Sequence, residues 1–392
     1  MKALKLMMGR PFISNNRDKR ELEVLHSLGC EVLVYCRYDD KADVENYPYQ
    51  FVYEDMSPRL KPLIKHAGIN VHYAKWVEAK RLSKLEPDII SGHNLPGLMM
   101  AWRISLFCKK KPALIYDSHE FTLGEVSEES RKIQRRVKRQ ETFLLPKCAF
   151  IIEVNDSIAD RVQSIYNLKT RPIVVRSTPL NWNLDNETIK TNRKEFLKAN
   201  GLPENTFVLV TLGRIVKDNG IFECIKAIEQ TENTALLAMG PFRSSRDLEN
   251  AREMVRSKKL ENRVIFHDSL PQNEIWKLAG IADASFCLIK NNHQSFYLSL
   301  PNKLFESVQA MVPIIGSNFP EIQHTIDKYG IGICCDPDNI KEIVNTIIRL
   351  KSNKQEMQLL KKNLIIAKEE LCWENEQQVL KNAYQNVIES YK

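Results

Sequence analysis

Short runs of apolar and β-branched residues alternate along the chain with longer segments in which apolar residues recur every three or four positions. The short runs are typical of buried strands, and the periodic segments are typical of helices with one buried face. In the first half the predicted strands are 4–8, 31–36, 50–53, 88–91, 113–116, 150–154 and 173–176. In the second half they are 207–212, 235–239, 264–266, 284–289, 313–316 and 331–334. The alternation favours parallel sheets covered by helices, one sheet in each half.

The chain is long enough for two domains. A single hydrophobic core stops growing at about 250–300 residues, and this sequence has 392. The break is predicted near 179–192, a polar stretch with four asparagines and no clear periodicity. The predicted fold class is therefore α/β, with two Rossmann-like doubly wound domains, 1–185 and 186–372, that face each other across a cleft. Ligands of such sheets bind at the carboxyl ends of the strands.

Composition limits the classes of protein that this chain can be. Hydrophobic residues make up 43% and charged residues 27%, as in soluble globular proteins. No apolar run approaches the roughly 18 residues of a membrane-spanning helix. Nine scattered cysteines without a C-x-x-C pair fit neither a zinc site nor a disulfide framework, and they predict a reducing cytoplasm.

The net charge of +8 is unevenly spread. Residues 1–185 carry 30 Lys and Arg against 23 Asp and Glu, whereas the remainder carries 27 against 26. A basic half beside a nearly neutral half is expected when one half faces an anionic surface or ligand. The charge alone does not identify the anion.

The segment around Pro301 predicts an abrupt helix start. Pro301 suits the first helical position, because its φ is already helical and no amide hydrogen is needed there. Helix N-termini bind anions, phosphates above all. Asn302 and Glu306 share one face, with Lys303 beside them. Amides and an ammonium group for a diphosphate, with a carboxylate for two ribose hydroxyls, would hold a nucleoside diphosphate. An ordinary capped helix with a solvated Glu306 is the alternative.

Gly213-Arg214 directly follows the predicted strand 207–212. An arginine at the carboxyl end of a strand, in a loop before a helix, is well placed to meet phosphate oxygens with its several donors. The alternative is a surface arginine that caps its own turn.

A second polar run follows the strand 113–116 in the basic half. It begins at Asp117 and continues through Ser118 and His119 to Glu120. A histidine after a strand end can be a general base, an electrostatic contact or an ordinary loop residue. Four polar residues at one strand end favour a site over a lone loop histidine.

Together these motifs resemble the retaining GT-B glycosyltransferases of the large family called group 1 or family 4. The likeness is carried by Gly213-Arg214 with Gly220, by Pro301-Asn302-Lys303-Leu304-Phe305-Glu306 with Pro313, and by Tyr116-Asp117-Ser118-His119-Glu120. It extends over nearly the whole chain through Asn16-Arg17 with Arg20-Glu21 and through Trp373-Glu374. The signature around Glu306 is specific, and the weaker motifs arrive in the family's order.

The resemblance implies a sugar transferase that keeps the anomeric configuration and holds a nucleotide-sugar donor mainly with its second domain. The implied donor-binding residues are Arg214, Lys217, Asn219, Pro301, Asn302, Lys303 and Glu306. Glu306 would take the ribose hydroxyls, and the amides of Asn302 and Lys303 the diphosphate. Arg214 would neutralise the leaving diphosphate, and His119 would lie at the reacting face of the sugar.

The resemblance also implies roles for the first domain. Arg17, Asp117 and Glu120 are the candidates on the acceptor side, and a last helix, 373–392, would pack back onto this domain. No metal is expected, because protein cations would stabilise the leaving group. Asp336-Pro337-Asp338 has the Asp-x-Asp form of metal-dependent sugar transferases, but it precedes the periodic stretch 340–350, which favours helix capping.

The sequence departs from the family pattern at two positions. The family's lysine before the glycine of the Gly-Arg loop is replaced by Asn219, and its glutamate eight residues before the ribose-binding one is replaced by Leu298. Lys217 or Lys303 is a candidate to replace the missing positive charge. The second departure leaves open which sugar hydroxyls are read.

The segment 131–139 carries six basic residues: Arg131, Lys132, Arg135, Arg136, Lys138 and Arg139. Ile133, Val137 and Leu144 form a rough apolar stripe on the same predicted helix. The helix could contact an anionic membrane surface, with Arg131, Arg135, Arg136 and Arg139 as the contact candidates. A solvated helix that packs its stripe on the sheet is the alternative. Nucleic acid is excluded as a partner, since no aromatic residues interleave with the cluster and no nucleic-acid-binding signature appears.

The sequence thus predicts a glycosyltransferase that builds cell-surface polysaccharide or glycolipid, either free in the cytoplasm or peripheral on the inner face of the membrane. Its acceptor would be a glycan or a lipid-linked molecule, and its default donor a UDP-sugar, with no cofactor. A nucleotide-sugar epimerase and a non-catalytic nucleotide-sugar-binding protein are the alternatives. A ribose-binding Glu306 disfavours deoxyribonucleotides, because one hydrogen-bond partner would be missing.

Overall fold

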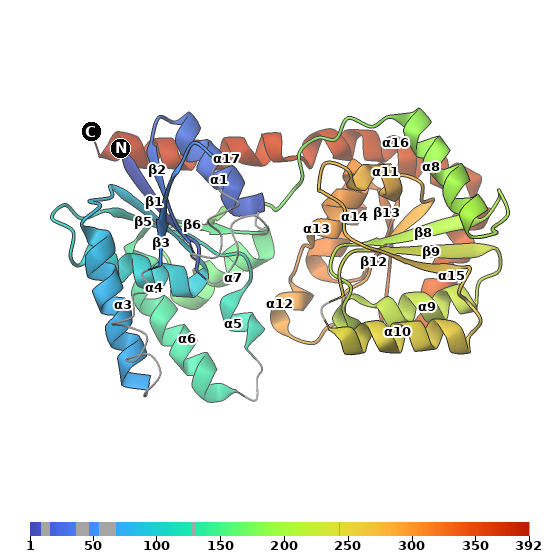
Figure 1. The fold of residues 1–392 in the computed structure, drawn as a ribbon, viewed down its shortest axis with the longest axis horizontal. Helices are drawn as coiled ribbons and strands as arrows, with labels where there is room; N and C mark the ends of the chain where they lie inside the picture. Colours follow the sequence, from blue (N-terminus) through green and yellow to red (C-terminus); the bar gives the residue numbers. More distant parts are fainter. Residues whose placement is uncertain (9–15, 37–46, 55–67, 127–129, 243, 392) are drawn as a thin grey trace. The chain divides into compact units, whose positions relative to one another are not determined.

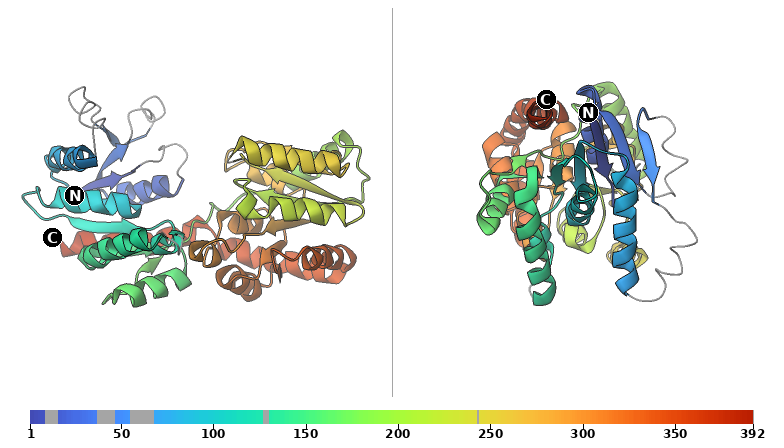
Figure 2. Two further views of the ribbon diagram at one scale, coloured as in Figure 1. Left: turned by 90° about the horizontal axis from the view of Figure 1, so that it is seen from below. Right: turned by 90° about the vertical axis from the view of Figure 1, so that its left-hand side faces the viewer.

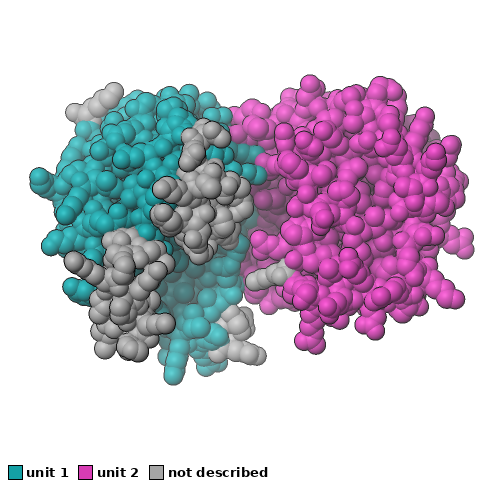
Figure 3. Space-filling view, in the orientation of Figure 1, with its two compact units in different colours: residues 1–176, 376–392 teal, residues 177–375 magenta. Residues whose placement is uncertain are grey.

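The computed structural model describes residues 1–8, 16–36, 47–54, 68–126, 130–242 and 244–391. The chain divides into two compact units, shown in different colours in Figure 3. Unit 1 comprises Met1–Arg176 and Glu376–Lys392, and unit 2 comprises Ser177–Asn375. The division lies shortly before the boundary predicted at 185.

Unit 1 is built on a seven-stranded parallel sheet with the strand order β3-β2-β1-β4-β5-β6-β7 (Figure 1). Its strands are β1 (Lys2–Leu6), β2 (Glu31–Cys36), β3 (Gln50–Tyr53), β4 (Ile89–His93), β5 (Ala113–Asp117), β6 (Cys148–Glu153) and β7 (Ile173–Val174). Its helices are α1 (Asn16–Ser27), α3 (Gly68–Ser83), α4 (Asn94–Ser105), α5 (Thr122–Glu125), α6 (Arg131–Leu144) and α7 (Asp156–Tyr166), followed in part by the last helix, α17 (Trp373–Ser390).

Unit 2 has a six-stranded parallel sheet with the order β10-β9-β8-β11-β12-β13. Its strands are β8 (Phe207–Leu212), β9 (Thr234–Met239), β10 (Val264–His267), β11 (Ala284–Cys287), β12 (Ile314–Ser317) and β13 (Gly332–Cys335). Its helices are α8 (Asn186–Ala199), α9 (Ile221–Glu229), α10 (Ser245–Ser257), α11 (Ile275–Ala279), α12 (Gln294–Tyr297), α13 (Asn302–Gln309), α14 (Pro320–Tyr329), α15 (Ile340–Ser352) and α16 (Lys354–Glu370). Every predicted strand is present with its ends within two residues of the prediction, and the predicted pair of doubly wound α/β domains is confirmed.

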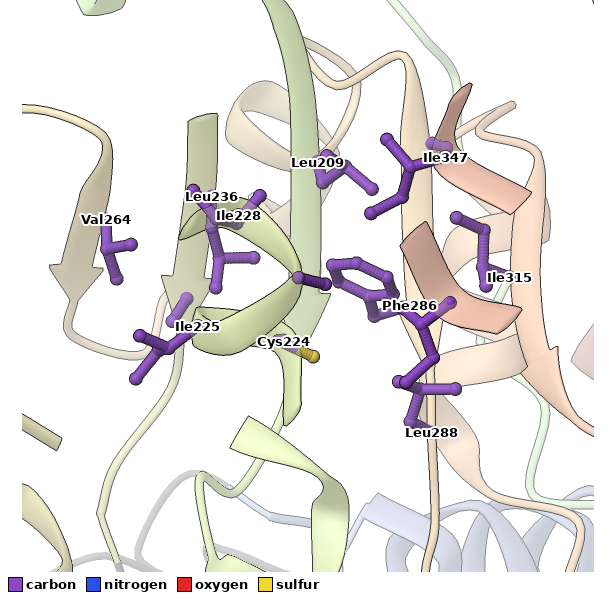
Figure 4. Close-up of a cluster of buried hydrophobic side chains, with 14 of the residues drawn as sticks. Leu209, Cys224, Ile225, Ile228, Leu236, Val264, Phe286, Leu288, Ile315 and Ile347 are labelled. Carbon is purple, nitrogen blue, oxygen red and sulfur yellow. The ribbon is translucent and has the colours of Figure 1, made fainter. Parts of the chain in front are cut away.

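Helices cover both faces of each sheet, which is why most strand residues are apolar (Figure 2). In unit 2, Leu209 of β8 points into a cluster with α9, α10 and α15, which Figure 4 shows around Phe286. Its neighbours Val208 and Val210 point to the opposite face, where α8 and α11 pack. The alternation of side chains along one strand therefore supplies two cores.

Each sheet has one place where the strand order reverses. In unit 1 this switch point lies between β1 and β4, and in unit 2 between β8 and β11. Successive crossovers leave in opposite directions on the two sides of such a point, which opens a crevice at the carboxyl ends of the strands. The sequence motifs follow strands at or beside these two points.

The helix α17 packs on unit 1 from Glu376 onward. Tyr384 is fully buried, its hydroxyl donates a hydrogen bond to the carboxylate of Glu21 in α1, and its ring meets Phe150 edge-on at 5.1 Å. Nearer its start, Glu376 accepts a hydrogen bond from the backbone amide of Arg176 at 2.8 Å. No helix among the described residues combines the length and the apolar character needed to cross a bilayer.

Two predicted helix starts are wrong in detail. Pro301 is the N-cap residue of α13 and not its first helical residue, because its ψ of 149° is extended; the helix begins at Asn302. The carbonyl of the N-cap residue already accepts a bond from the first turn. The start of α15 is capped by the side chain of Asn339, whereas Asp336 accepts a bond from the amide of Asp338 at 2.9 Å.

Candidate active site

The loop after β8 is shaped by two glycines. Gly213 has a φ of +81°, and a Cβ atom on Gly240, in the loop after β9, would lie 1.9 Å from the carbonyl oxygen of Gly213. Only glycine allows this approach of the two backbones. The close contact fixes the path of the chain at the carboxyl end of the sheet, and Arg214 follows it with an exposed side chain.

The remainder of this loop is held by its own polar groups. The side-chain amide of Asn219 donates to the carbonyl oxygen of Arg214 at 2.7 Å, and Lys217 is exposed. Gly220 precedes α9 with a φ of +70°, and a Cβ atom there would lie 2.9 Å from the Cβ of Leu288. Asn219 therefore braces the arginine loop, and Gly220 brings it against the segment that follows β11.

The start of α13 rests on the same segment. The ammonium group of Lys303 donates to the carbonyl oxygen of Leu288 at 2.9 Å, and its side chain is buried. Burial lowers the pKa of Lys303. Glu306 follows one turn later with 9% of its surface exposed. The Lys303 ammonium is thus used inside the protein, which leaves the amides of the first turn as the groups that α13 offers to an anion.

The two motifs of unit 2 therefore meet on Leu288. The same segment makes a further contact with the arginine loop, because the amide of Lys290 donates to the carbonyl oxygen of Asp218 at 2.9 Å. Both motifs lie at the switch point between β8 and β11, where a ligand of this fold binds.

In unit 1 the corresponding switch point carries a buried group of charges. Lys5 of β1 is fully buried, and its ammonium nitrogen lies 2.8 Å from Asp18, 3.4 Å from Asp117 and in contact with Glu21. Burial disfavours the charged lysine, but attraction to the three carboxylates outweighs it and raises the pKa of Lys5. Burial likewise acts to raise the pKa of Asp18, yet Lys5 and the neighbouring histidines lower it.

Asp117 connects this group to His119. It accepts hydrogen bonds from Nε and Nη2 of Arg17 at 3.1 and 2.9 Å, and its Oδ2 atom lies 2.9 Å from Nε2 of His119. Burial would raise the pKa of Asp117, but Arg17, His119 and Lys5 hold it well below its usual value. Burial lowers the pKa of His119 against the attraction of Asp117, which favours the neutral imidazole.

The candidates on the acceptor side differ in their surroundings. Arg17 and Asp117 bond to each other, and Arg17 also donates to the carbonyl oxygen of Val175 at 2.7 Å. The carbonyl oxygen of Glu120 accepts a bond from the hydroxyl of Ser118 at 2.9 Å. Arg17 and Asp117 thus support His119, and their contact with an acceptor stays a prediction.

The sequence analysis missed His93, which ends β4 opposite Asp117 of β5. The side chain of His93 is buried, and its Nδ1 atom lies 3.0 Å from Asp18. Its ring centroid is 3.9 Å from that of His119. A signal was present, because His93 follows a buried strand just as His119 does. No feature of the sequence indicated that Lys5 is buried, since a lysine in a strand is usually exposed.

Four side chains of this group have the chemistry of metal ligands. Ligand atoms of Asp18, His93, Asp117 and His119 lie within 4.8 Å of one another, the one such group in the described part of the chain. The ammonium group of Lys5 already pairs with both carboxylates. A metal ion would have to displace that cation, so the donor set does not fit a resident metal.

The basic helix α6 is buried along a narrow stripe. Val137, Glu141 and Leu144 are buried, whereas Ile133, predicted on the apolar stripe, is 54% exposed. The four candidate contact residues are all exposed: Arg131, Arg135, Arg136 and Arg139. Five residues of the helix line a surface hollow of about 580 Å³: Arg135, Lys138, Arg139, Thr142 and Phe143.

Two family models match the chain, one on each half. The model described as Glycosyl transferases group 1 matches residues 192–365, and the model described as Glycosyltransferase Family 4 matches residues 20–181. The chain belongs to the group 1 glycosyltransferases. The resemblance to the group 1 and family 4 glycosyltransferases is thereby confirmed, whereas retention of the anomeric configuration stays a prediction.

Solved structures share the fold of this glycosyltransferase. HepE of Anabaena in complex with UDP-glucose has a TM-score of 0.76 and 14% identity, over 99% of this chain and 100% of that one. Sucrose-phosphate synthase of Thermosynechococcus elongatus has a TM-score of 0.75 and 16% identity over the whole of both chains. WaaG, a glycosyltransferase involved in lipopolysaccharide biosynthesis, has a TM-score of 0.61 and 14% identity, over 97% and 99%. No curated protein sequence matches the chain.

Proposed function

We propose that this glycosyltransferase moves a sugar from a UDP-sugar to a glycan or lipid-linked acceptor, with retention of the anomeric configuration, in the synthesis of cell-surface polysaccharide or glycolipid. The observation that carries the proposal is the meeting of the Arg214 loop and the start of α13 on Leu288. Retention follows from the family resemblance, and the choice of uridine is supported by HepE, which was solved with UDP-glucose.

Each group in unit 2 has a proposed part in holding the donor. The amides of Asn302 and Lys303 bind the diphosphate, because the first turn of a helix offers donors and a partial positive charge. Glu306 accepts hydrogen bonds from the two ribose hydroxyls. Pro301 sets the start of the helix, and Asn219 keeps the arginine loop in place through the carbonyl of Arg214.

Catalysis rests on the charge that develops as the sugar leaves. The bond between the anomeric carbon and the diphosphate oxygen breaks as the acceptor oxygen bonds to the same carbon, the acceptor's proton passes to the leaving diphosphate, and negative charge grows on the diphosphate before that proton arrives. Arg214 stabilises that charge with its guanidinium group. The ammonium of Lys303 is engaged with Leu288, so the exposed Lys217 is the proposed replacement for the missing lysine at Asn219. These cations make a metal unnecessary, and activity is expected to survive EDTA.

His119 is the proposed catalytic group of unit 1. Asp117 holds its imidazole and burial favours the neutral form, which can accept a hydrogen bond from a hydroxyl at the reacting face of the sugar. Arg17, Asp117 and Glu120 are the proposed groups nearest the acceptor.

We propose that the protein acts at the cytoplasmic face of an anionic membrane. Beside the basic residues of α6, a row of aromatic rings crosses three helices: Phe143 meets Trp102 at 5.3 Å, and Trp102 meets Trp76 at 6.0 Å. The ammonium of Lys147 lies 4.1 Å above the ring of Phe143, which is 49% exposed. An exposed phenylalanine ring among cations suits the boundary between lipid headgroups and acyl chains.

The function is tested by incubating the protein with UDP-sugars, with and without candidate acceptors, in EDTA. Acceptor-dependent release of UDP with a new α- or β-linkage of the donor's own configuration is the expected result. Altered sugar on an intact nucleotide would instead establish an epimerase. Binding without conversion, with every nucleotide sugar and acceptor tried, would establish a non-catalytic binding protein.

A further inference from the structure

His119 has two carboxylates within reach. Its Nε2 atom lies 2.9 Å from Asp117 and 3.8 Å from Asp18. Both carboxylates are buried; burial acts to raise their pKa values, but the neighbouring cations and histidines lower them, which favours the ionised form, and an ionised carboxylate only accepts hydrogen bonds. Whichever one His119 bonds, the bonded ring nitrogen must therefore carry the hydrogen. The choice of carboxylate decides the direction in which the rest of the ring points.

His93 engages the second of these carboxylates. Its Nδ1 atom lies 3.0 Å from Oδ2 and 3.2 Å from Oδ1 of Asp18, and the ammonium of Lys5 lies 2.8 Å from Oδ1. Both oxygens of Asp18 are thus in use. The ring of His93 also lies against that of His119, with centroids 3.9 Å apart and planes at 49°.

The backbone of His119 is also held in place. Its amide donates to the side-chain oxygen of Asn94 at 3.0 Å, and Asn94 directly follows His93. Asn94 has a φ of +54°, a conformation that asparagine adopts more readily than most residues. His93 at the end of β4 therefore contacts the ring of His119, and Asn94 directly after it contacts the backbone.

We propose that His93 is a positioning residue, which occupies Asp18 and packs on the ring of His119 so that His119 bonds to Asp117 alone. With either carboxylate the hydrogen of His119 is on Nε2, and the bond to Asp117 sets the direction of the lone pair on Nδ1, the atom that meets the substrate hydroxyl. This inference rests on the proposed catalytic role of His119. It adds a second histidine, with Asp18 and Lys5 behind it, to the residues that the reaction needs.

The positions of the hydrogens can be measured without any substrate. Nitrogen NMR of the full-length protein labelled with ¹⁵N-histidine distinguishes the two neutral forms of each ring. The wild-type protein should show His119 with its hydrogen on Nε2 and His93 with its hydrogen on Nδ1. Replacing the exposed His324 by asparagine gives a control that should leave both signals unchanged. A wild-type His119 with its hydrogen on Nδ1 would overturn the proposal, even if no His93 variant folds.

Measurements of turnover distinguish a positioning role of His93 from a purely structural one. His93→Phe keeps a ring against His119 but releases Asp18, and it should lower kcat by roughly 10- to 100-fold while the donor KM stays within about threefold. His93→Asn keeps a donor for Asp18 and should recover most of that loss. In a His119→Asn background, His93→Phe should have no further effect, because it acts through the missing ring.

The outcomes distinguish this inference from the proposed function. If His119→Asn leaves turnover unchanged, the catalytic role of His119 is wrong. If His119→Asn lowers turnover but His93→Phe lowers it equally in both backgrounds, the positioning role of His93 is wrong. A thermal unfolding scan of each variant shows whether a loss of turnover comes from a loss of folded protein.

Discussion

The ammonium group of Lys5 lies 2.8 Å from a carboxylate oxygen of Asp18, and neither side chain has any exposed surface. The pair lies at the switch point of unit 1, in contact with the residues that hold His119. A buried ion pair does not by itself stabilise a fold, but breaking one leaves a buried charge without its partner. Lys5 therefore links the stability of unit 1 to the geometry of its site.

Replacing Lys5 by methionine should destabilise unit 1 by about 3–5 kcal/mol, because three carboxylates lose their shared cation. The control is Lys2→Met on the same strand, where Lys2 pairs with an exposed Glu31 at 3.4 Å. That change should cost at most about 1 kcal/mol. Urea unfolding measures both. Equal effects of the two substitutions would contradict the account of Lys5.

The stability of unit 1 should fall as the pH rises from about 4.5 to 7. Burial raises the pKa of Glu141 in α6 to about 7, against the hydrogen bonds that it accepts from Tyr166 and Tyr116. Between these pH values the folded state holds a proton that the unfolded state has lost. The contribution of Glu141 to the free energy of unfolding is therefore fully present below the pKa of the unfolded state. It declines by up to about 3 kcal/mol as the pH rises to the pKa of the folded state.

The variant Glu141→Gln should flatten this part of the stability curve, whereas Glu195→Gln at an exposed position of α8 should keep the wild-type slope. The titration of Asp18 and Asp117 does not contribute to this decline in stability. Their lowered pKa values act in the opposite direction, since that stability is present above the unfolded pKa and is lost only at lower pH. Urea midpoints at several pH values are the measurement. An unchanged slope in Glu141→Gln would show that the carboxyl is ionised throughout.

Lys259 is a site where a glycine should stabilise the protein. It has a φ of +53° after α10, and the bonds from Lys259 to Arg256 and from Leu260 to Val255 form a Schellman motif. A residue with a Cβ atom is strained in this conformation, so Lys259→Gly should gain about 1 kcal/mol. The neighbouring Lys258→Gly, at a φ of −98°, should gain nothing. The thermal midpoints decide, and a lower midpoint for Lys259→Gly would refute the argument.

The strands were predictable because both faces of each sheet are covered, which makes each strand a continuous apolar run. Leu209 and Val210 illustrate this, since they face different cores but are both fully buried. The positions of the Arg214 loop and of α13 after their strands were predictable because the pattern of the neighbouring residues is local, as the bond from Asn219 to Arg214 shows; their roles in binding stay predictions. Helix starts were less certain, as Pro301 shows, because proline suits both the N-cap and the position after it.

The interior of unit 1 was not predictable from local pattern. Glu21 and the Tyr384 hydroxyl that bonds to it are 363 residues apart, and Lys5 and Asp117 are 112 apart. No periodicity in either segment records such a pairing. For His93, the sequence showed its position at the end of a strand but gave no indication of its partner, the carboxylate of Asp18.

Binding to anionic vesicles should depend on α6. Replacing Arg135 and Arg136 by glutamate should weaken binding to vesicles containing phosphatidylserine by at least about tenfold, and high salt should do the same to the wild-type protein. The matched control reverses Arg246 and Arg252, which are exposed on α10. It changes the net charge equally and should have little effect. Equal losses for both pairs, or no binding by the wild-type protein, would favour a solvated surface helix.

The central claim is that Glu306 reads the ribose of a nucleoside diphosphate held by α13 and the Arg214 loop. Titration calorimetry with UDP and with 2′-deoxy-UDP tests it most directly, using the wild-type protein, Glu306→Gln and the exposed control Glu253→Gln. The wild-type and control proteins should bind UDP roughly tenfold or more tightly than its deoxy analogue, and Glu306→Gln should lose that preference, because the charged acceptor is gone. A Glu306→Gln protein that binds UDP as tightly as the wild type and still rejects the deoxy analogue would contradict the account.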